Sequence, residues 1–107
     1  MPEIKTSAKT DYLSTAALCA EKYGTPFYLI DKDEVINRVS EIKRRLPENA
    51  KLCYAIKSNA FLTDFLKYED ILFEVCSPGE LSICEKYGLS PEKIVFSGVV
   101  KSLEDVK

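Results

Sequence analysis

The sequence predicts an α/β fold with a parallel sheet, and three observations carry this prediction. Strand and helix patterns alternate from Leu52 onward, with strand-like runs at 52–57, 71–76 and 94–97. The connections between these runs are short, and such alternation produces parallel neighbouring strands with right-handed crossovers. Candidate site residues lie at or near the carboxyl ends of these runs: Lys57, Glu74, Ser77 and Gly98. We expect the three strands to be neighbours in chain order, with Lys57 and Glu74 at the carboxyl edge, where parallel folds carry their sites.

The first 30 residues are expected to form one helix and one strand. Residues 1–13 are polar. Ser14 is suited to cap a helix over 15–23, and Gly24 suits the left-handed position that follows a last helical turn. The uninterrupted aromatic and β-branched run 27–30 then indicates a strand.

A second helix is expected between Asp31 and Pro47. Asp31 with Glu34 three residues on has the pattern of a capping box, and proline ends a helix. The apolar positions of this segment recur at helical spacing: Val35, Val39, Ile42 and Leu46.

Three further helices are expected between and after the strands. One covers 61–68. Another begins at Ser77, with Pro78 at its first position and Glu80 closing a capping box. A last helix begins at Ser102.

Composition excludes several classes of function. The 107 residues have a formal net charge of -2, which provides no electrostatic attraction for nucleic acid or an anionic membrane. No apolar run reaches the length of a membrane span or a signal peptide. The chain has no histidine and no Cys-x-x-Cys pair, so it has neither a zinc motif nor a Ser-His or Cys-His nucleophile pair. The four cysteines are interpreted as reduced thiols of a cytoplasmic protein.

Lys57 is the candidate catalytic residue. On a strand it would share a face with Ala55 and Cys53, whose small side chains leave room for a bulky group. A buried ammonium is costly, so burial would depress the pKa of Lys57 and favour the neutral amine that forms Schiff bases with aldehydes. The alternative is a solvated charge at a strand end, and spacing alone favours it. Glu74 also has two interpretations: it is either a solvated carboxylate at the rim of the sheet or a carboxylate paired with a cation.

Four segments in register carry a resemblance to one family. Tyr54-Ala55-Ile56-Lys57-Ser58-Asn59 resembles the lysine motif of the PLP-dependent decarboxylases with an alanine-racemase-type barrel, closest to diaminopimelate decarboxylase. The segments 23–28, 73–81 and 94–102 are similar to three further blocks of that family. The chain departs from the pattern at three positions: it has Glu74 for aspartate, Pro78 for glycine and Val99 for asparagine.

The resemblance implies a fold and a set of site residues. The chain would be the N-terminal part of a PLP-binding (β/α)8 TIM barrel, incomplete over residues 1–107, within a longer polypeptide. The strand within 25–31 would belong to a C-terminal β domain that this chain lacks. Lys57 would hold pyridoxal 5'-phosphate and act in catalysis, supported by nearby polar residues: Glu74, Ser77, Glu80 and Asn59.

The resemblance also implies an activity. The parent enzyme would decarboxylate meso-diaminopimelate to L-lysine and carbon dioxide through a Schiff base on Lys57, as a cytoplasmic homodimer. We expect residues 1–107 alone to be inactive. Two alternatives stay open: a carboxynorspermidine, ornithine or lysine decarboxylase of the same family, and a non-catalytic homologue that binds a partner protein.

Overall fold

The computed structural model describes residues 12–107, which fall into two compact units. The first unit ends at Asp31 and the second covers 32–107. No helix within 12–107 is long and apolar enough to cross a membrane.

The described part of the first unit consists of one helix and an extended segment. Helix α1 (Tyr12–Tyr23) buries Thr15 and Cys19. Ser14 therefore lies inside this helix and does not cap it, which corrects the sequence prediction. The backbone N–H of Gly24 donates to the Ala20 carbonyl over 2.9 Å, and Gly24 has the expected left-handed conformation, with φ of 78°.

The predicted strand at 27–30 is wrong for this chain. These residues form no strand, and Tyr28 is 97% exposed. A strand is completed by backbone hydrogen bonds to a neighbour. Among residues 12–107 the only sheet lies in the second unit. The segment 27–30 therefore has no partner strand among these residues, although its aromatic and β-branched composition is typical of a strand.

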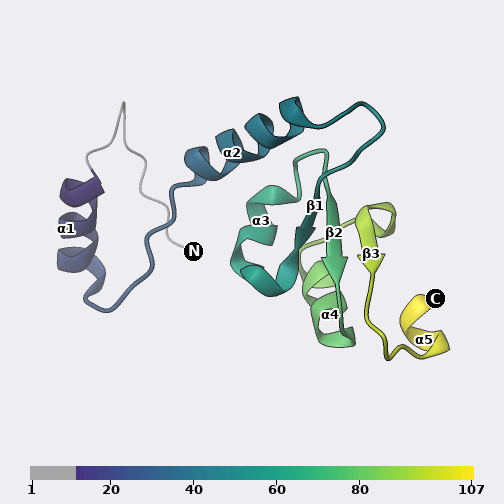
Figure 1. Ribbon diagram of the computed structural model, residues 1–107. Helices are drawn as coiled ribbons and strands as arrows, with labels where there is room; N and C mark the ends of the chain where they lie inside the picture. The colour runs from purple at the N-terminus through teal and green to yellow at the C-terminus, as the bar shows by residue number, and fades with distance from the viewer. Residues whose placement is uncertain (1–11) are drawn as a thin grey trace. The chain divides into compact units, whose positions relative to one another are not determined.

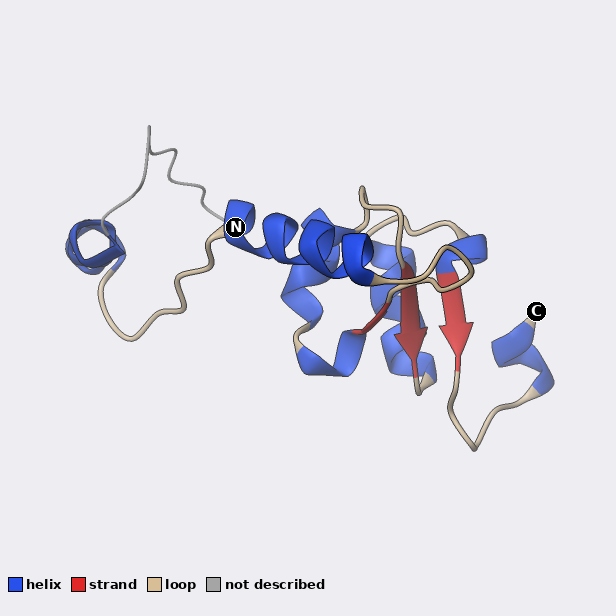
Figure 2. Ribbon diagram, turned by 45° about the horizontal axis from the view of Figure 1, so that its top comes forward, coloured by secondary structure: helices blue, strands red, loops and turns tan. Residues whose placement is uncertain are grey.

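The second unit contains the expected parallel sheet. Strands β1 (Cys53–Ala55), β2 (Leu72–Val75) and β3 (Ile94–Phe96) lie in the order β1-β2-β3, and both neighbouring pairs are parallel. The arrows of β2 and β3 point the same way in Figure 2. The predicted order and direction are confirmed. The first strand is shorter than expected, because the chain enters a 3-10 turn after Ala55.

Short helices connect the strands (Figure 1). Between β1 and β2 lie the 3-10 turns η1 (Ile56–Ser58) and η2 (Ala60–Leu62) and helix α3 (Thr63–Leu66). Helix α4 (Pro78–Lys86) and the 3-10 turn η3 (Pro91–Lys93) lie between β2 and β3. Helix α2 (Lys32–Arg45) precedes β1, and α5 (Leu103–Val106) follows β3. The predicted helix at 61–68 is thus divided into a 3-10 turn and a single α-turn. The predicted starts at Ser77 and Ser102 are confirmed, since each serine side chain accepts a backbone hydrogen bond from the third helical residue.

One face of the sheet forms the core of the second unit. Phe73 and Val75 on β2 are fully buried, and they alternate with the half-buried Glu74 on the opposite face. The core is completed by residues around the sheet: Ile56, Phe65, Leu66, Ile71, Cys84 and Leu89. Burial of this one face explains why the register is well defined, because a shift by one residue would bring Glu74 into the core.

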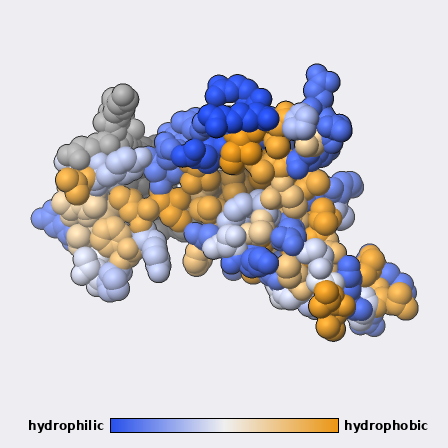
Figure 3. Space-filling view, in the orientation of Figure 1, coloured by the Kyte–Doolittle hydropathy of each residue, from blue (hydrophilic) through white to orange (hydrophobic). Residues whose placement is uncertain are grey.

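The opposite face of the sheet is open. Its register places Cys53 beside Leu72, and Glu74 between Ala55 and Val95. Cys53 and Val95 are exposed. The end of the chain also exposes apolar side chains, which Figure 3 shows in orange: Val99, Val100, Leu103 and Val106.

Candidate functional site

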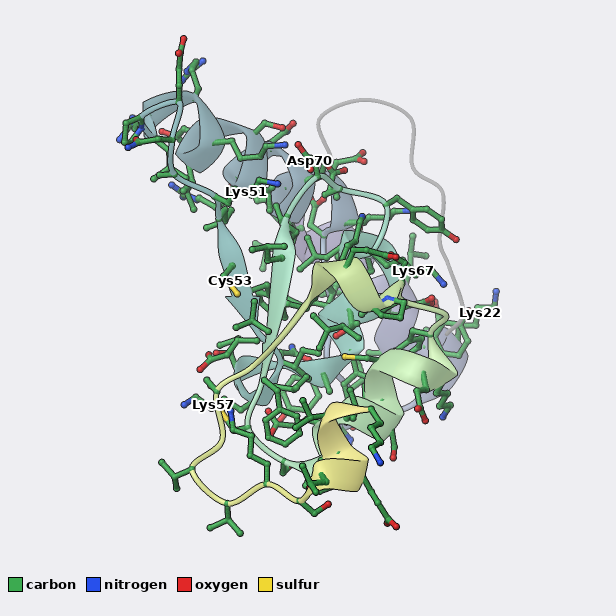
Figure 4. All side chains as sticks on the ribbon, turned by 90° about the vertical axis from the view of Figure 1, so that its right-hand side faces the viewer. Lys22, Lys51, Cys53, Lys57, Lys67 and Asp70 are labelled. Atoms are coloured by element: carbon green, nitrogen blue, oxygen red, sulfur yellow. The ribbon has the colours of Figure 1, made fainter. Side chains whose placement is uncertain are left out.

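Lys57 lies at the carboxyl edge of the sheet, in the 3-10 turn that directly follows β1. Figure 4 shows Lys57 beyond Cys53 along the chain, at the end of the sheet opposite to Lys51 and Asp70. The residue is exposed. The expected burial of its ammonium is therefore wrong for this chain. Ile56 takes the buried position in the turn, 1% exposed, and this directs the following lysine to solvent.

Asn59 fixes the turn that carries Lys57. Its side-chain oxygen Oδ1 accepts a hydrogen bond from the backbone N–H of Phe61 over 3.1 Å, and so caps η2. The hydroxyl of Tyr54 donates to the Asn59 carbonyl over 2.7 Å. Burial is the main cause that raises the pKa of Tyr54 above its ordinary value. Asn59 thus holds the backbone that follows Lys57, and its support of the lysine in a site stays a prediction.

Glu74 lies at the same edge as Lys57, as the sequence predicted. Its oxygen Oε1 accepts a hydrogen bond from the Ser97 hydroxyl over 2.5 Å and a weaker one from the Cys76 thiol over 3.7 Å. The Ser97 hydrogen bond is the largest cause that lowers the pKa of Glu74 below 4.5, against partial desolvation, and the charge of Lys57 lowers it further. Glu74 is thus half-buried, hydrogen-bonded and electrostatically coupled to Lys57.

Ser97 and Cys76 were not among the residues that sequence reasoning assigned to the site. Their side chains lie 3.5 Å apart at the sulfur and oxygen atoms, each just after the end of its strand. The available signal was their position, because each follows its strand by one or two residues, as Lys57 does. Cys76 reaches Glu74 from two residues further along the chain, whereas the contact of Ser97 with Glu74 depends on the register between β2 and β3, which residue patterns alone do not provide.

Ser77 and Glu80 cap helix α4. The Ser77 hydroxyl donates to Glu80 Oε2 over 2.9 Å and accepts from the Glu80 backbone N–H over 3.3 Å. Glu80 Oε2 also accepts from the backbone N–H of Cys76 over 3.1 Å, one residue earlier than the usual capping box. Within residues 12–107 no hydrogen bond or ion pair joins either side chain to Lys57. Their connection to the site is the backbone of Cys76.

Gly98 holds the ends of β2 and β3 close together. It is buried, and a Cβ atom at this position would lie 2.3 Å from the Cys76 carbonyl oxygen and 2.7 Å from Cε1 of Phe96. The backbone N–H of the preceding Ser97 donates to the Val75 carbonyl over 2.9 Å. These two contacts fix the backbone from which the Ser97 hydroxyl reaches Glu74.

The open face beside Glu74 suits a flat, bulky group. Cys53 and Ala55 provide small side chains on that face, and Lys57 provides an exposed primary amine at its edge. Partial desolvation is the main cause that raises the pKa of the Cys53 thiol above 9.0, and the charge of Glu74 adds to it. Within 12–107 no group of three or more acidic, cysteine or histidine side chains is arranged to hold a metal ion. The residues present fit a pyridoxal aldehyde, which needs an accessible amine and an unobstructed surface.

A parallel α/β domain with an accessible lysine at its carboxyl edge is typical of a class of cofactor-binding domains. Comparison with known proteins identifies the family. Residues 32–107 match the family model described as pyridoxal-dependent decarboxylase, pyridoxal binding domain. The chain belongs to this family. Pyridoxal phosphate is the cofactor of such domains, in agreement with the sequence prediction.

Several curated relatives are diaminopimelate decarboxylases. The chain is 32% identical to that of Aquifex aeolicus over 89 residues, which cover 81% of this chain and 21% of the relative. It is 32% identical to that of Mycobacterium tuberculosis over 91 residues (81% and 20%), and 36% identical to that of Helicobacter pylori over 90 residues (81% and 22%). The chain therefore spans about a fifth of the length of these relatives. No solved structure matches the chain significantly.

Proposed function

We propose that this chain is the lysine-bearing segment of a PLP-dependent amino-acid decarboxylase that converts meso-diaminopimelate to L-lysine and carbon dioxide. One observation carries the proposal. Within the matched residues 32–107, Lys57 is exposed at the carboxyl edge of a parallel sheet and is coupled to the charge of Glu74. The diaminopimelate decarboxylases to which the chain is 32–36% identical support the choice of substrate.

In this proposal each residue has a definite task. Lys57 holds the pyridoxal group through its Nζ atom, and the bound cofactor supplies an electron sink for the carbon that loses its carboxylate. Glu74 provides a fixed negative charge that stabilises a positive charge on Nζ and assists proton movement at that atom. Asn59 and the Ser77–Glu80 cap hold the backbone on either side of the site.

The wider architecture belongs to the same proposal. The three parallel strands would form the first part of an alanine-racemase-like (β/α)8 barrel, with their open face turned to its interior and residues 1–107 forming a partial N-terminal domain. The polar Glu74 on a face otherwise lined by small and apolar residues supports this arrangement, because such barrels carry their sites at the carboxyl ends of the strands. We further propose that the active protein is a cytoplasmic homodimer, with small amino acids and neither nucleic acid nor membranes as its partners.

The test is decarboxylation by the protein purified at its natural length. Carbon dioxide release is measured with PLP and, in separate reactions, diaminopimelate, ornithine, lysine or carboxynorspermidine. We expect release from diaminopimelate and its loss in Lys57→Ala. Lys51→Ala is the matched control, because Lys51 is an exposed lysine at the other end of the sheet (Figure 4). Activity that prefers another of these substrates, or that survives Lys57→Ala, would contradict the proposal.

A further inference from the structure

We propose that Ser97 is a positioning residue, whose hydroxyl holds one oxygen of Glu74 and so keeps the ionised carboxylate fixed at the edge of the sheet that carries Lys57. This inference rests on the proposed function of Lys57 and Glu74 and adds a residue from the third strand to the site. It also assigns a supporting task to the thiol of Cys76. Both residues act through Glu74, so neither is a catalytic residue.

The backbone brings Ser97 to Glu74 in a fixed way. Glu74 is paired with Val95 in the register of β2 and β3, and Ser97 is two residues further along, on the same face. The Ser97 backbone N–H is bonded to Val75, and Gly98 permits the close approach to Cys76. The hydroxyl therefore starts from a backbone position with little freedom.

The hydrogen bonds are arranged asymmetrically on the carboxylate. The Ser97 hydroxyl and the Cys76 thiol both donate to Oε1. Oε2 receives neither of these donors. A hydroxyl that donates to a carboxylate over 2.5 Å forms a charge-assisted hydrogen bond, which is stronger than one between neutral groups. This bond restrains the rotation of a carboxylate that would otherwise turn freely at a half-exposed position.

The Ser97 hydrogen bond and the charge of Lys57 act on Glu74 in the same direction, since both lower the pKa of its carboxyl group. The hydrogen bond from Ser97 is the first cause that lowers the pKa of Glu74, ahead of the charge of Lys57. The other titratable groups near the carboxylate are the thiols of Cys53 and Cys76. Without the Ser97 hydroxyl, Glu74 would be a weaker acid and its carboxylate would be less firmly held.

Three variants of Ser97 separate positioning from a structural role. Ser97→Ala removes the donor, Ser97→Thr retains a hydroxyl at an exposed position, and Ser97→Cys replaces it with a weaker donor. Ser82→Ala is the matched control. The Ser82 hydroxyl donates to the Pro78 carbonyl over 3.1 Å on the exposed surface of α4, so its loss leaves Glu74 unaffected.

The first measurement is the titration of the Glu74 side-chain carboxyl carbon by nuclear magnetic resonance, without cofactor or substrate. We expect Ser97→Ala to raise the pKa of Glu74 toward 4.5, Ser97→Cys to give an intermediate value, and Ser97→Thr and Ser82→Ala to match the unsubstituted protein. If Ser97→Ala does not fold, Ser97→Cys and Ser97→Thr provide the comparison. An unchanged titration when the hydroxyl is lost, or no recovery with threonine, overturns the proposal.

The second measurement is steady-state kinetics of the loaded enzyme. We expect Ser97→Ala to lower kcat by roughly tenfold, as for the loss of one hydrogen bond to a charged group, with little change in KM. Ser97→Thr should restore kcat. A change in KM alone would place Ser97 in substrate binding and refute positioning. If decarboxylation is absent altogether while the Glu74 titration still depends on Ser97, the proposed function fails and the coupling of Ser97 to Glu74 stands.

Discussion

Substitution of Gly98 by alanine tests how tightly the ends of β2 and β3 are joined. The added Cβ atom would lie 2.3 Å from the Cys76 carbonyl oxygen, whereas real Cβ atoms essentially never approach a neighbour within 3.0 Å. It would also lie 2.7 Å from Cε1 of Phe96. One of these neighbours is backbone, so a side-chain rotation cannot relieve the contact.

The expected cost follows from this geometry. Forcing an additional carbon into a packed site destabilises a protein by about 1–3 kcal/mol. In urea, where the unfolding free energy falls by about 1–3 kcal/mol per molar denaturant, such a loss lowers the midpoint by roughly 1 M. The unfolding midpoint is measured by far-ultraviolet circular dichroism on the unsubstituted protein and Gly98→Ala.

Gly79→Ala is the matched control. Gly79 lies in α4, and the nearest heavy atom to its added Cβ would be Ser77 Oγ at 3.8 Å, an ordinary contact. Alanine favours a helix over glycine by about 1 kcal/mol, so this variant should be at least as stable as the unsubstituted protein. A Gly98→Ala protein with an unchanged midpoint would refute the close approach of Gly98 to Cys76.

Four further predictions follow from the site and its core. Phe73→Ala should destabilise the protein by about 3–5 kcal/mol, because Phe73 is fully buried, whereas Tyr28→Ala, at a 97% exposed position, should have little effect in the same urea titration. Glu74→Gln should lower the pKa of Cys53 and speed its alkylation by iodoacetamide at pH 8, since the charge of Glu74 contributes to the raised pKa; an unchanged rate would contradict this electrostatic link. Because the pKa of Glu74 is lowered on folding, its ionisation stabilises the protein above pH 4.5, and this contribution is lost as the pH falls through the folded value. The difference in unfolding free energy between the unsubstituted protein and Glu74→Gln should therefore shrink below pH 4.5. A difference that does not change with pH would contradict the lowered pKa of Glu74. Residues 1–107 purified alone with PLP should release no more carbon dioxide from diaminopimelate than free PLP does, and release that is lost in Lys57→Ala would show that the short chain is a complete enzyme.

Local patterns predicted those parts of the fold that depend on nearby residues. The caps at Ser77 and Ser102 and the left-handed Gly24 depend on a few adjacent positions, and the structure has them as expected. The parallel order of the strands was also predictable, because alternating strands and helices with short connections allow few other topologies.

Two of the errors and omissions concern contacts between distant residues, whereas the exposure of Lys57 concerns a local turn. The segment 27–30 has the composition of a strand, but a strand also needs a partner, which composition does not reveal. The exposure of Lys57 follows from the 3-10 turn after Ala55, which the strand pattern of 52–57 does not indicate. Ser97 reaches Glu74 across 23 positions of sequence, so this contact depends on the register of two strands and is invisible to motif spacing.

The measurement that tests the central claim most directly is the position of the covalently held cofactor. The protein at its natural length is loaded with PLP, reduced with borohydride, digested and mapped by mass spectrometry. We predict a pyridoxyl group on Lys57 and its absence from that peptide in Lys57→Ala. A pyridoxyl group on another lysine, such as Lys51 or Lys67, with Lys57 unmodified, would contradict the assignment of the site.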